Sequence, residues 1–153
     1  MKIEILLGFL LISCISFGQE KGSGGKLSLE QAAMDIRHYT LDLTVNPNSQ
    51  SYGGSTTIDL KLVKETPTLI FDLDNRFFVS EILVNGKNMP YNHYNGQIHI
   101  PGTPIFTLGD YSIKISYNGQ PKIAKNPPWD GGIQWSQDAQ GRPWIAMSCQ
   151  EDG

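Results

Sequence analysis

The chain has 153 residues, 39% of them hydrophobic, and its twelve Lys and Arg against fifteen Asp and Glu give a net charge of −3. This length accommodates one ordinary domain, and the hydrophobic fraction argues against a largely disordered chain. The charge argues against nucleic acid as a partner, because phosphate binding needs clustered cations and the sequence has no basic run.

The first residues have the pattern of a signal peptide. Lys2 precedes an apolar run over residues 5–12, which is too short to span a membrane but fits the apolar region of an export signal. Small residues around Gly18 predict cleavage after that position, so residues 1–18 form the expected leader. Leu11-Ile-Ser-Cys14 also resembles a lipoprotein box, with Cys14 as the lipidated residue. Either way we expect an exported chain, periplasmic or extracellular, without a stable membrane span.

Residues 19–34 are expected to connect the leader to the folded part. The segment EKGSGGK at 20–26 has the composition of a flexible linker. Ser28 and Gln31 then have the spacing of a capping box ahead of three apolar residues. This spacing predicts one short helical turn.

From residue 36 onward, apolar residues recur with a period of two, as in half-buried strands. In the first such run Tyr39, Leu41, Leu43 and Val45 form the apolar row. The predicted strands cover residues 36–45, 52–62, 69–73, 78–84, a weak segment near 91, 97–100 and 111–117. Asn-Gly pairs at 85, 95 and 118 predict turns, and the prolines at 101 and 104 are expected to end a strand. About seven or more strands with almost no helix predict an antiparallel all-β domain.

The stretch over residues 126–153 has no sustained helical or strand period. It holds all three tryptophans, Trp129, Trp135 and Trp144, together with a Pro-Pro pair and a Gly-Gly pair that fix backbone angles. This composition predicts a shaped loop region with short strands. The tryptophans either cap one end of a β-sheet core or shape part of a binding cleft, and composition does not choose between the two.

Taken alone, the residues contain no recognisable catalytic machinery. His38, His93 and His99 have no partner at metal-ligand spacing, so structural or solvent roles are expected for them. The motifs H-E-x-x-H, C-x-x-C and G-x-S-x-G are absent. After cleavage at Gly18 only Cys149 would remain, and its surroundings predict a small buried side chain rather than a nucleophile.

An ordered set of segments resembles the N-terminal domain of the M1-family zinc aminopeptidases, especially the forms common in Bacteroidota. The most specific of them is Asn-Pro-Pro-Trp-Asp-Gly-Gly at 126–132, followed by Trp144-Ile-Ala146 and Cys149-Gln150. The earlier segments are Asp35 to Leu43, Gly53 to Ile58, Thr68 to Leu73, Val84 to Gly86 and Ile115 to Gly119. The resemblance implies a saddle-like β-sandwich that leans on a thermolysin-like catalytic domain.

The resemblance also implies a role for the chain end in substrate binding. In the family, a Gln and an acidic residue two positions later help to hold the free α-amino group of a peptide substrate. The matching positions are Gln150 and Asp152, and a carboxylate there would pair with the substrate ammonium. Glu151 lies next to Asp152 and leaves the register of the acidic residue open.

The zinc ligands, the general base and the exopeptidase motif of the family do not occur in this sequence. We therefore expect residues 35–153 to be a C-terminally incomplete domain, inactive alone and without a cofactor of its own. Zinc would belong to the implied full-length enzyme. The expected partners are the missing catalytic domain and a peptide substrate. The alternative is a stand-alone exported β-sandwich module that binds peptide or carbohydrate through its tryptophans.

Overall fold

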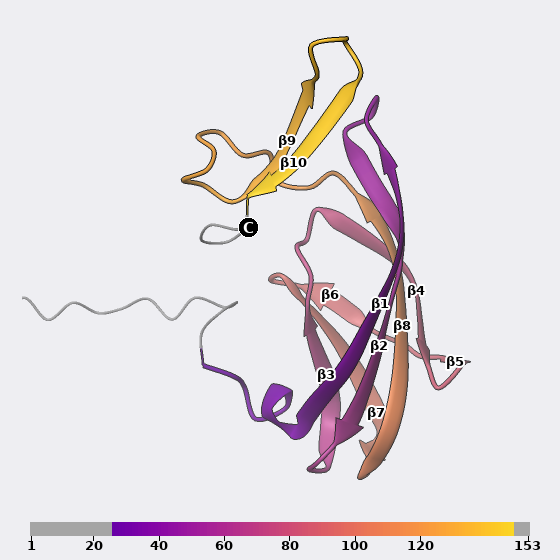
Figure 1. Ribbon diagram of the computed structural model, residues 1–153. Helices are drawn as coiled ribbons and strands as arrows, with labels where there is room; N and C mark the ends of the chain where they lie inside the picture. Colours follow the sequence, from indigo (N-terminus) through magenta and orange to yellow (C-terminus); the bar gives the residue numbers. More distant parts are fainter. Residues whose placement is uncertain (1–25, 149–153) are drawn as a thin grey trace, which may run out of the picture.

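The computed structural model describes residues 26–148, which form almost nothing but antiparallel strands (Figure 1). The 3₁₀ turn η1 (Gln31–Ala33) comes first. The strands are β1 (Met34–Asn46), β2 (Ser51–Leu62), β3 (Thr66–Asp72), β4 (Phe77–Val84), β5 (Lys87–Asn88), β6 (Asn92–Tyr94), β7 (Gln97–Phe106), β8 (Gly109–Gly119), β9 (Gly132–Gln137) and β10 (Pro143–Ser148). This architecture confirms the all-β prediction.

The strands form three antiparallel sheets. A large sheet has the order β1-β2-β8-β4-β5, a small sheet has the order β3-β7-β6, and β9 and β10 form a separate hairpin. Figure 1 shows the large sheet as a long curved wall, with the small sheet against the lower part of its concave face. The β9–β10 hairpin stands at the opposite, upper end. The fold is therefore a two-layer sandwich along only part of the large sheet.

The hydrophobic core lies between the large and small sheets. Its fully buried members come from both layers, because alternate residues of each strand point inward. The largest of them are Leu60, Leu62, Leu69, Ile82, Ile98, Ile100 and Ile113. Each such side chain stabilises the fold by about 1.5–3 kcal/mol relative to exposure.

The helical turn η1 closes one end of this core. The Ser28 hydroxyl accepts a hydrogen bond from the Gln31 N–H at 3.1 Å, and the Ser28 N–H donates to the Gln31 side-chain oxygen at 3.3 Å. This reciprocal pair is the arrangement that the capping-box spacing indicated. It seats Ala33 in the core. No helix among the described residues is long and apolar enough to cross a membrane.

Two of the three predicted Asn-Gly turns are present. Asn85 and Gly86 have φ angles of 50° and 77°, and Asn95 and Gly96 have 52° and 74°. Positive φ at both central residues is the requirement of a type I′ hairpin turn, which Asn-Gly meets at low cost.

The third predicted turn is wrong. Asn118 and Gly119 are the last two residues of β8, where Gly119 pairs with Tyr52 on one side and with Phe77 on the other. A Cβ atom on Gly119 would lie 2.4 Å from the Arg76 carbonyl oxygen. The glycine is therefore needed for a close strand approach rather than for a turn.

The prediction that the prolines end a strand near residue 100 is also wrong. β7 runs through Pro101 and Pro104 and pairs again with β3 at Phe106, opposite Thr66, after a register shift. The neighbour on its other side, β6, pairs only with the first residues of β7. Beyond them β7 has a partner on one side only, and such an edge tolerates proline.

The apolar row of β1 departs from the half-buried strand that its period predicts. Tyr39, Leu41, Leu43 and Val45 are 55%, 63%, 37% and 47% exposed. Their pairing with β2 puts them on the same face as the buried Ile58. The period thus identified the core face correctly, but the small sheet does not extend over this part of it (Figure 1).

Candidate functional site

The Trp-rich segment is joined to the upper end of the large sheet by a loop over residues 120–131. Ile123 and Ile133 form a parallel bridge, in which the Ile133 N–H donates to the Lys122 carbonyl at 2.8 Å. Gly132 has φ = 135°, and a Cβ atom there would lie 2.7 Å from the Lys122 carbonyl oxygen. Gly132 therefore lets the returning chain pack directly against the loop.

Asp130 closes the middle of this loop. Its carboxylate accepts hydrogen bonds from the backbone N–H groups of Lys125 at 2.6 Å and Asn126 at 2.7 Å. Desolvation acts to raise the pKa of Asp130, but these hydrogen bonds and the charge of Lys122 outweigh it, so the pKa lies below its ordinary value. The closed loop presents Trp129 to solvent, with 76% of the residue exposed.

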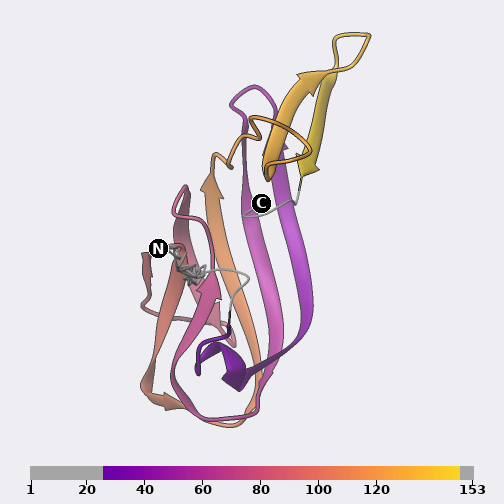
Figure 2. The same cartoon turned by 90° about the vertical axis from the view of Figure 1, so that its left-hand side faces the viewer.

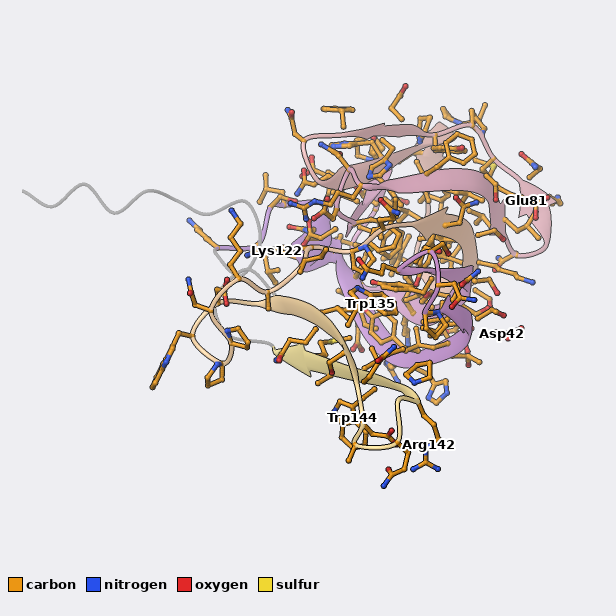
Figure 3. The ribbon with its side chains drawn as sticks, turned by 90° about the horizontal axis from the view of Figure 1, so that it is seen from above. Asp42, Glu81, Lys122, Trp135, Arg142 and Trp144 are labelled. Atoms are coloured by element: carbon orange, nitrogen blue, oxygen red, sulfur yellow. The ribbon has the colours of Figure 1, made fainter. Side chains whose placement is uncertain are left out.

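The other two tryptophans lie on opposite faces of the β9–β10 hairpin. Trp135 pairs with Ile145 and Trp144 pairs with Ser136, and side chains at consecutive strand positions point to opposite faces. Figure 3 shows Trp135 on the side of the large sheet and Trp144 on the far side. The Trp135 Nε1 atom is inaccessible to solvent and has no hydrogen-bond partner within residues 26–148, whereas Trp144 is 61% exposed. The three tryptophans do not form one stacking platform.

The tip of the hairpin is fixed by a second carboxylate. Asp138 accepts hydrogen bonds from the backbone N–H groups of Arg142 and Gln140, both at 2.9 Å, and from Arg142 Nε at 2.7 Å. The backbone bond from Arg142 is the main reason that the pKa of Asp138 lies below its ordinary value. The sequence analysis did not predict that Asp130 and Asp138 close these turns. An Asp within a turn that contains Pro or Gly would have indicated it, because its short side chain can accept hydrogen bonds from nearby backbone N–H groups.

A groove of about 520 Å³ lies beside the loop at the end of the large sheet. Its lining residues are Gln50, Arg76, Gln120, Pro121 and Ile123. Gln120 donates to the Ser49 carbonyl at 3.0 Å, and Arg76 is paired with Asp74. The groove is open and of mixed polar and apolar lining, and Arg76, the one cation among these lining residues, is already paired with Asp74.

A smaller cavity of about 250 Å³ opens where the small sheet stops covering the large one. Tyr39, Phe71 and Asp72 contribute to its lining, together with Thr56 and Tyr117, whose hydroxyl groups are hydrogen-bonded at 2.9 Å. This cavity marks the boundary between the covered and the uncovered parts of the concave face.

The histidines are dispersed. His93 Nε2 lies 2.9 Å from the Leu73 carbonyl oxygen, and His99 stacks on Tyr94 with ring centroids 4.6 Å apart. His38 lies on β1 opposite Asp59. Between residues 26 and 148, no three His, Cys, Asp or Glu side chains are grouped so that they could hold a metal ion. The described residues therefore do not fit a zinc site, and no zinc-dependent step is assigned to them.

The predicted substrate-binding residues Gln150 and Asp152 lie outside the described residues, as does Cys149. β10 ends at Ser148, so the chain enters this stretch directly from the hairpin. The structure therefore places the segment that leads to the predicted site, but not the site itself.

The fold has clear counterparts among solved structures. An M1 zinc metallopeptidase variant from Deinococcus radiodurans, bound to a Tyr-Ser-Ala substrate, matches 75% of this chain with a TM-score of 0.54 and 20% identity. Native yeast LTA4 hydrolase matches 74% with a TM-score of 0.59 and 18% identity. The chain has the fold of the N-terminal domain of M1 aminopeptidases.

The likeness covers only part of each enzyme. The matched region is 28% of the Deinococcus protein and 18% of the yeast protein, so this chain spans less than a third of either. Neither protein-family profiles nor curated protein sequences match the chain. At these identities the likeness shows a shared fold and nothing more.

Proposed function

We propose that this chain is the N-terminal β domain of an exported, Bacteroidota-type zinc aminopeptidase. In this role it packs on a catalytic domain of the same polypeptide and helps to anchor the α-amino group of a peptide substrate through Gln150 and Asp152. The observation that carries the proposal is the fold shared with M1 zinc metallopeptidases, one of them bound to a tripeptide. The ordered segments of the sequence support it, above all residues 126–132.

The position of the β9–β10 hairpin supports the placement of Gln150 and Asp152. The hairpin is tied through the bridge between Ile123 and Ile133 to the loop that follows β8, and its tip is braced by Asp138. β10 ends at Ser148, so Gln150 and Asp152 lie close to this hairpin in sequence, and the proposal is that the hairpin directs them toward the substrate. A Gln oxygen and a carboxylate are both acceptors for a substrate ammonium.

The first test determines the genomic reading frame past the codon for Gly153. We expect it to continue into an H-E-x-x-H segment, and the encoded polypeptide to release N-terminal residues from aminoacyl-p-nitroanilides. A stop codon at that point contradicts the proposal for this product.

The second test addresses the anchor in that polypeptide. Gln150→Ala and Asp152→Asn should each lower kcat/KM by about 10- to 100-fold, because the first removes a hydrogen-bond acceptor and the second removes the negative charge that pairs with the substrate ammonium. Glu151→Gln is the matched control and should have little effect. Should Glu151→Gln prove the more damaging change, the acidic anchor is Glu151. Unchanged kinetics in all three variants would exclude the anchoring role.

A stand-alone binding module is the second candidate, because Trp129 and Trp144 expose large aromatic surfaces. In this role the chain would bind a peptide or a carbohydrate by stacking. Titration of the purified chain with oligosaccharides and peptides should then quench tryptophan fluorescence, and Trp129→Ala or Trp144→Ala should reduce the quenching. A reading frame that stops after Gly153 favours this candidate over the first.

A further inference from the structure

The sequence has three Asn-Gly pairs, at 85–86, 95–96 and 118–119. In such a pair the backbone nitrogen of glycine can attack the side-chain carbonyl carbon of the asparagine, because glycine has no Cβ atom to hinder the approach. The product is a five-membered imide, which water then opens to aspartate or isoaspartate. Because all three pairs consist of the same two residues, the surrounding structure decides which of them reacts.

The pair at 118–119 is held inside the large sheet. β8, orange in Figure 2, lies beside β2, and its other neighbour is β4. Gly119 pairs with Tyr52 of β2 and with Phe77 of β4. An attack by the Gly119 nitrogen would require an interior strand to separate from its neighbours, which is among the most costly local openings of a sheet. This pair is therefore protected.

The pair at 85–86 lies in an exposed turn, but its asparagine is anchored. The Asn85 N–H donates to the Ser112 carbonyl oxygen, and the Asn85 side-chain oxygen accepts a hydrogen bond from the Ser112 N–H, both at 2.8 Å. Ser112 belongs to β8, so these two bonds hold the asparagine against an interior strand of the large sheet. The side chain cannot turn its carbonyl carbon freely toward the Gly86 nitrogen while this anchor is in place.

The pair at 95–96 has neither restraint. Asn95 is exposed, and its side chain makes no hydrogen bond to any other residue between 26 and 148. The turn follows β6, an edge strand of three residues that pairs only with β7 in the described structure. The Gly96 N–H donates to the Asn75 side-chain oxygen at 3.0 Å, and this bond is exposed to solvent. Exposed bonds at short edge elements open at low cost, so the Gly96 nitrogen becomes available.

We propose that Asn95 is a site of spontaneous covalent modification, at which the chain converts asparagine to aspartate and isoaspartate. The Gly96 nitrogen forms a bond to Cγ of Asn95, and the bond from Cγ to Nδ2 breaks. Nδ2 leaves as ammonia, with the proton that the Gly96 nitrogen loses. Water is the co-reactant in the second step, and no electron donor or acceptor is needed. Opening of the imide at Cγ gives aspartate, whereas opening at the main-chain carbonyl gives isoaspartate.

The modification has a structural consequence for the segment after β3. The Gly96 carbonyl oxygen accepts a hydrogen bond from the Leu73 N–H at 2.9 Å, and the Gly96 N–H is bonded to Asn75, so the turn is tied to residues 73–75. Both products add a negative charge to the turn, and isoaspartate also routes the backbone through Cβ. The turn geometry that Asn-Gly provides is then lost, and residues 73–75 should loosen. This inference does not depend on the proposed peptidase role.

The experiment incubates the purified full chain in mildly alkaline buffer, which favours loss of the proton from the glycine nitrogen. Peptide mass spectrometry, with chromatography that separates aspartyl from isoaspartyl peptides, follows all three pairs in the same molecule. Conversion at Asn95 should be about tenfold or more faster than at Asn85 or Asn118, because only Asn95 reacts after the opening of a short edge. In concentrated urea the three rates should become similar, because the folded structure no longer restrains any pair.

Asn75→Ala tests the restraint on the nucleophile. It removes the hydrogen bond on the Gly96 nitrogen and should raise the rate at Asn95 by about 2- to 10-fold, the range expected for one hydrogen bond. The rate at Asn85 in the same variant is the internal control and should not change. Hydrogen exchange at the Leu73 amide should be faster in the modified chain than in the unmodified chain. Conversion at Asn85 or Asn118 that matches Asn95, or a folded chain that stays intact while the unfolded chain reacts, overturns the proposal.

Discussion

The two ends of the large sheet share the strands β1, β2 and β8 and the same alternation of apolar residues, but they differ in whether the apolar face is buried. At the lower end, Ile58, Leu60 and Ile113 are buried beneath the small sheet. At the upper end, Leu41 and Leu43 occupy the same face, and solvent reaches them. An apolar period therefore specifies which face of a strand avoids water, while a second layer decides whether that face is buried.

The largest expected effect contrasts a leucine of the core between the two sheets with a leucine of the exposed β1 row. Leu69→Ala should lower the free energy of unfolding by about 2–5 kcal/mol, because Leu69 is fully buried and its truncation leaves a cavity. Leu41→Ala should change it by no more than about 0.5 kcal/mol, as for other surface substitutions. Urea unfolding at a low protein concentration, at which the chain is monomeric, measures the change in the free energy of unfolding for both variants. Equal losses would mean that the upper face is buried in solution.

A smaller effect is expected for a glycine of the upper end. Gly54 has φ = 146°, and a Cβ atom there would lie 2.0 Å from the Asp42 carbonyl oxygen of β1. Gly54→Ala should destabilise the chain by about 1–3 kcal/mol, because it combines strain with a clash between neighbouring strands.

Gly86→Ala serves as the control for Gly54→Ala in the same unfolding experiment. Gly86 has φ = 77°, but no heavy atom lies within 4 Å of an added Cβ, so only the backbone strain remains. A smaller loss is expected there. Equal losses for the two variants would show that β1 and β2 separate easily at the upper end.

The smallest effect concerns the loop beside the hairpin. The pKa of Asp130 is lowered from 3.8, so above pH 3.8 the ionised carboxylate stabilises the loop. This stabilisation is lost as the pH falls through the lowered pKa and the carboxylate is protonated. Tryptophan fluorescence should therefore change below about pH 4, since Trp129 lies next to Asp130. Asp130→Asn should remove that step. Identical profiles for the two proteins would show that Asp130 does not hold the loop.

Most of the strand positions along the chain could be predicted from the sequence, because the apolar period is local information. The turns predicted at the Asn-Gly pairs at 85 and 95 were confirmed for the same reason. The turn predicted at residue 118 was wrong, because Gly119 pairs with Tyr52 and Phe77, which are distant in sequence. The sequence could not predict that the apolar row of β1 over residues 39–45 is exposed, since its exposure depends on where the small sheet ends.

The candidate site was predictable only in part. Composition located the segment around Trp129, Trp135 and Trp144, but it could not show that two of them point to opposite faces of a hairpin, because that depends on register. Gln150 and Asp152 came from resemblance to a family rather than from any property of their neighbours. They stay predictions that the kinetic variants above would decide.

The strand order of the large sheet has a consequence for the order of folding. β8 is the last strand of this sheet along the chain, yet it lies at its centre, between β2 and β4. During synthesis, the β1–β2 hairpin and the β4–β5 hairpin can each form early, because their strands are adjacent in sequence. Neither joins the other until residues 109–119 arrive. Such long-range pairing is slow, so the rate at which this domain appears should be set by the insertion of β8.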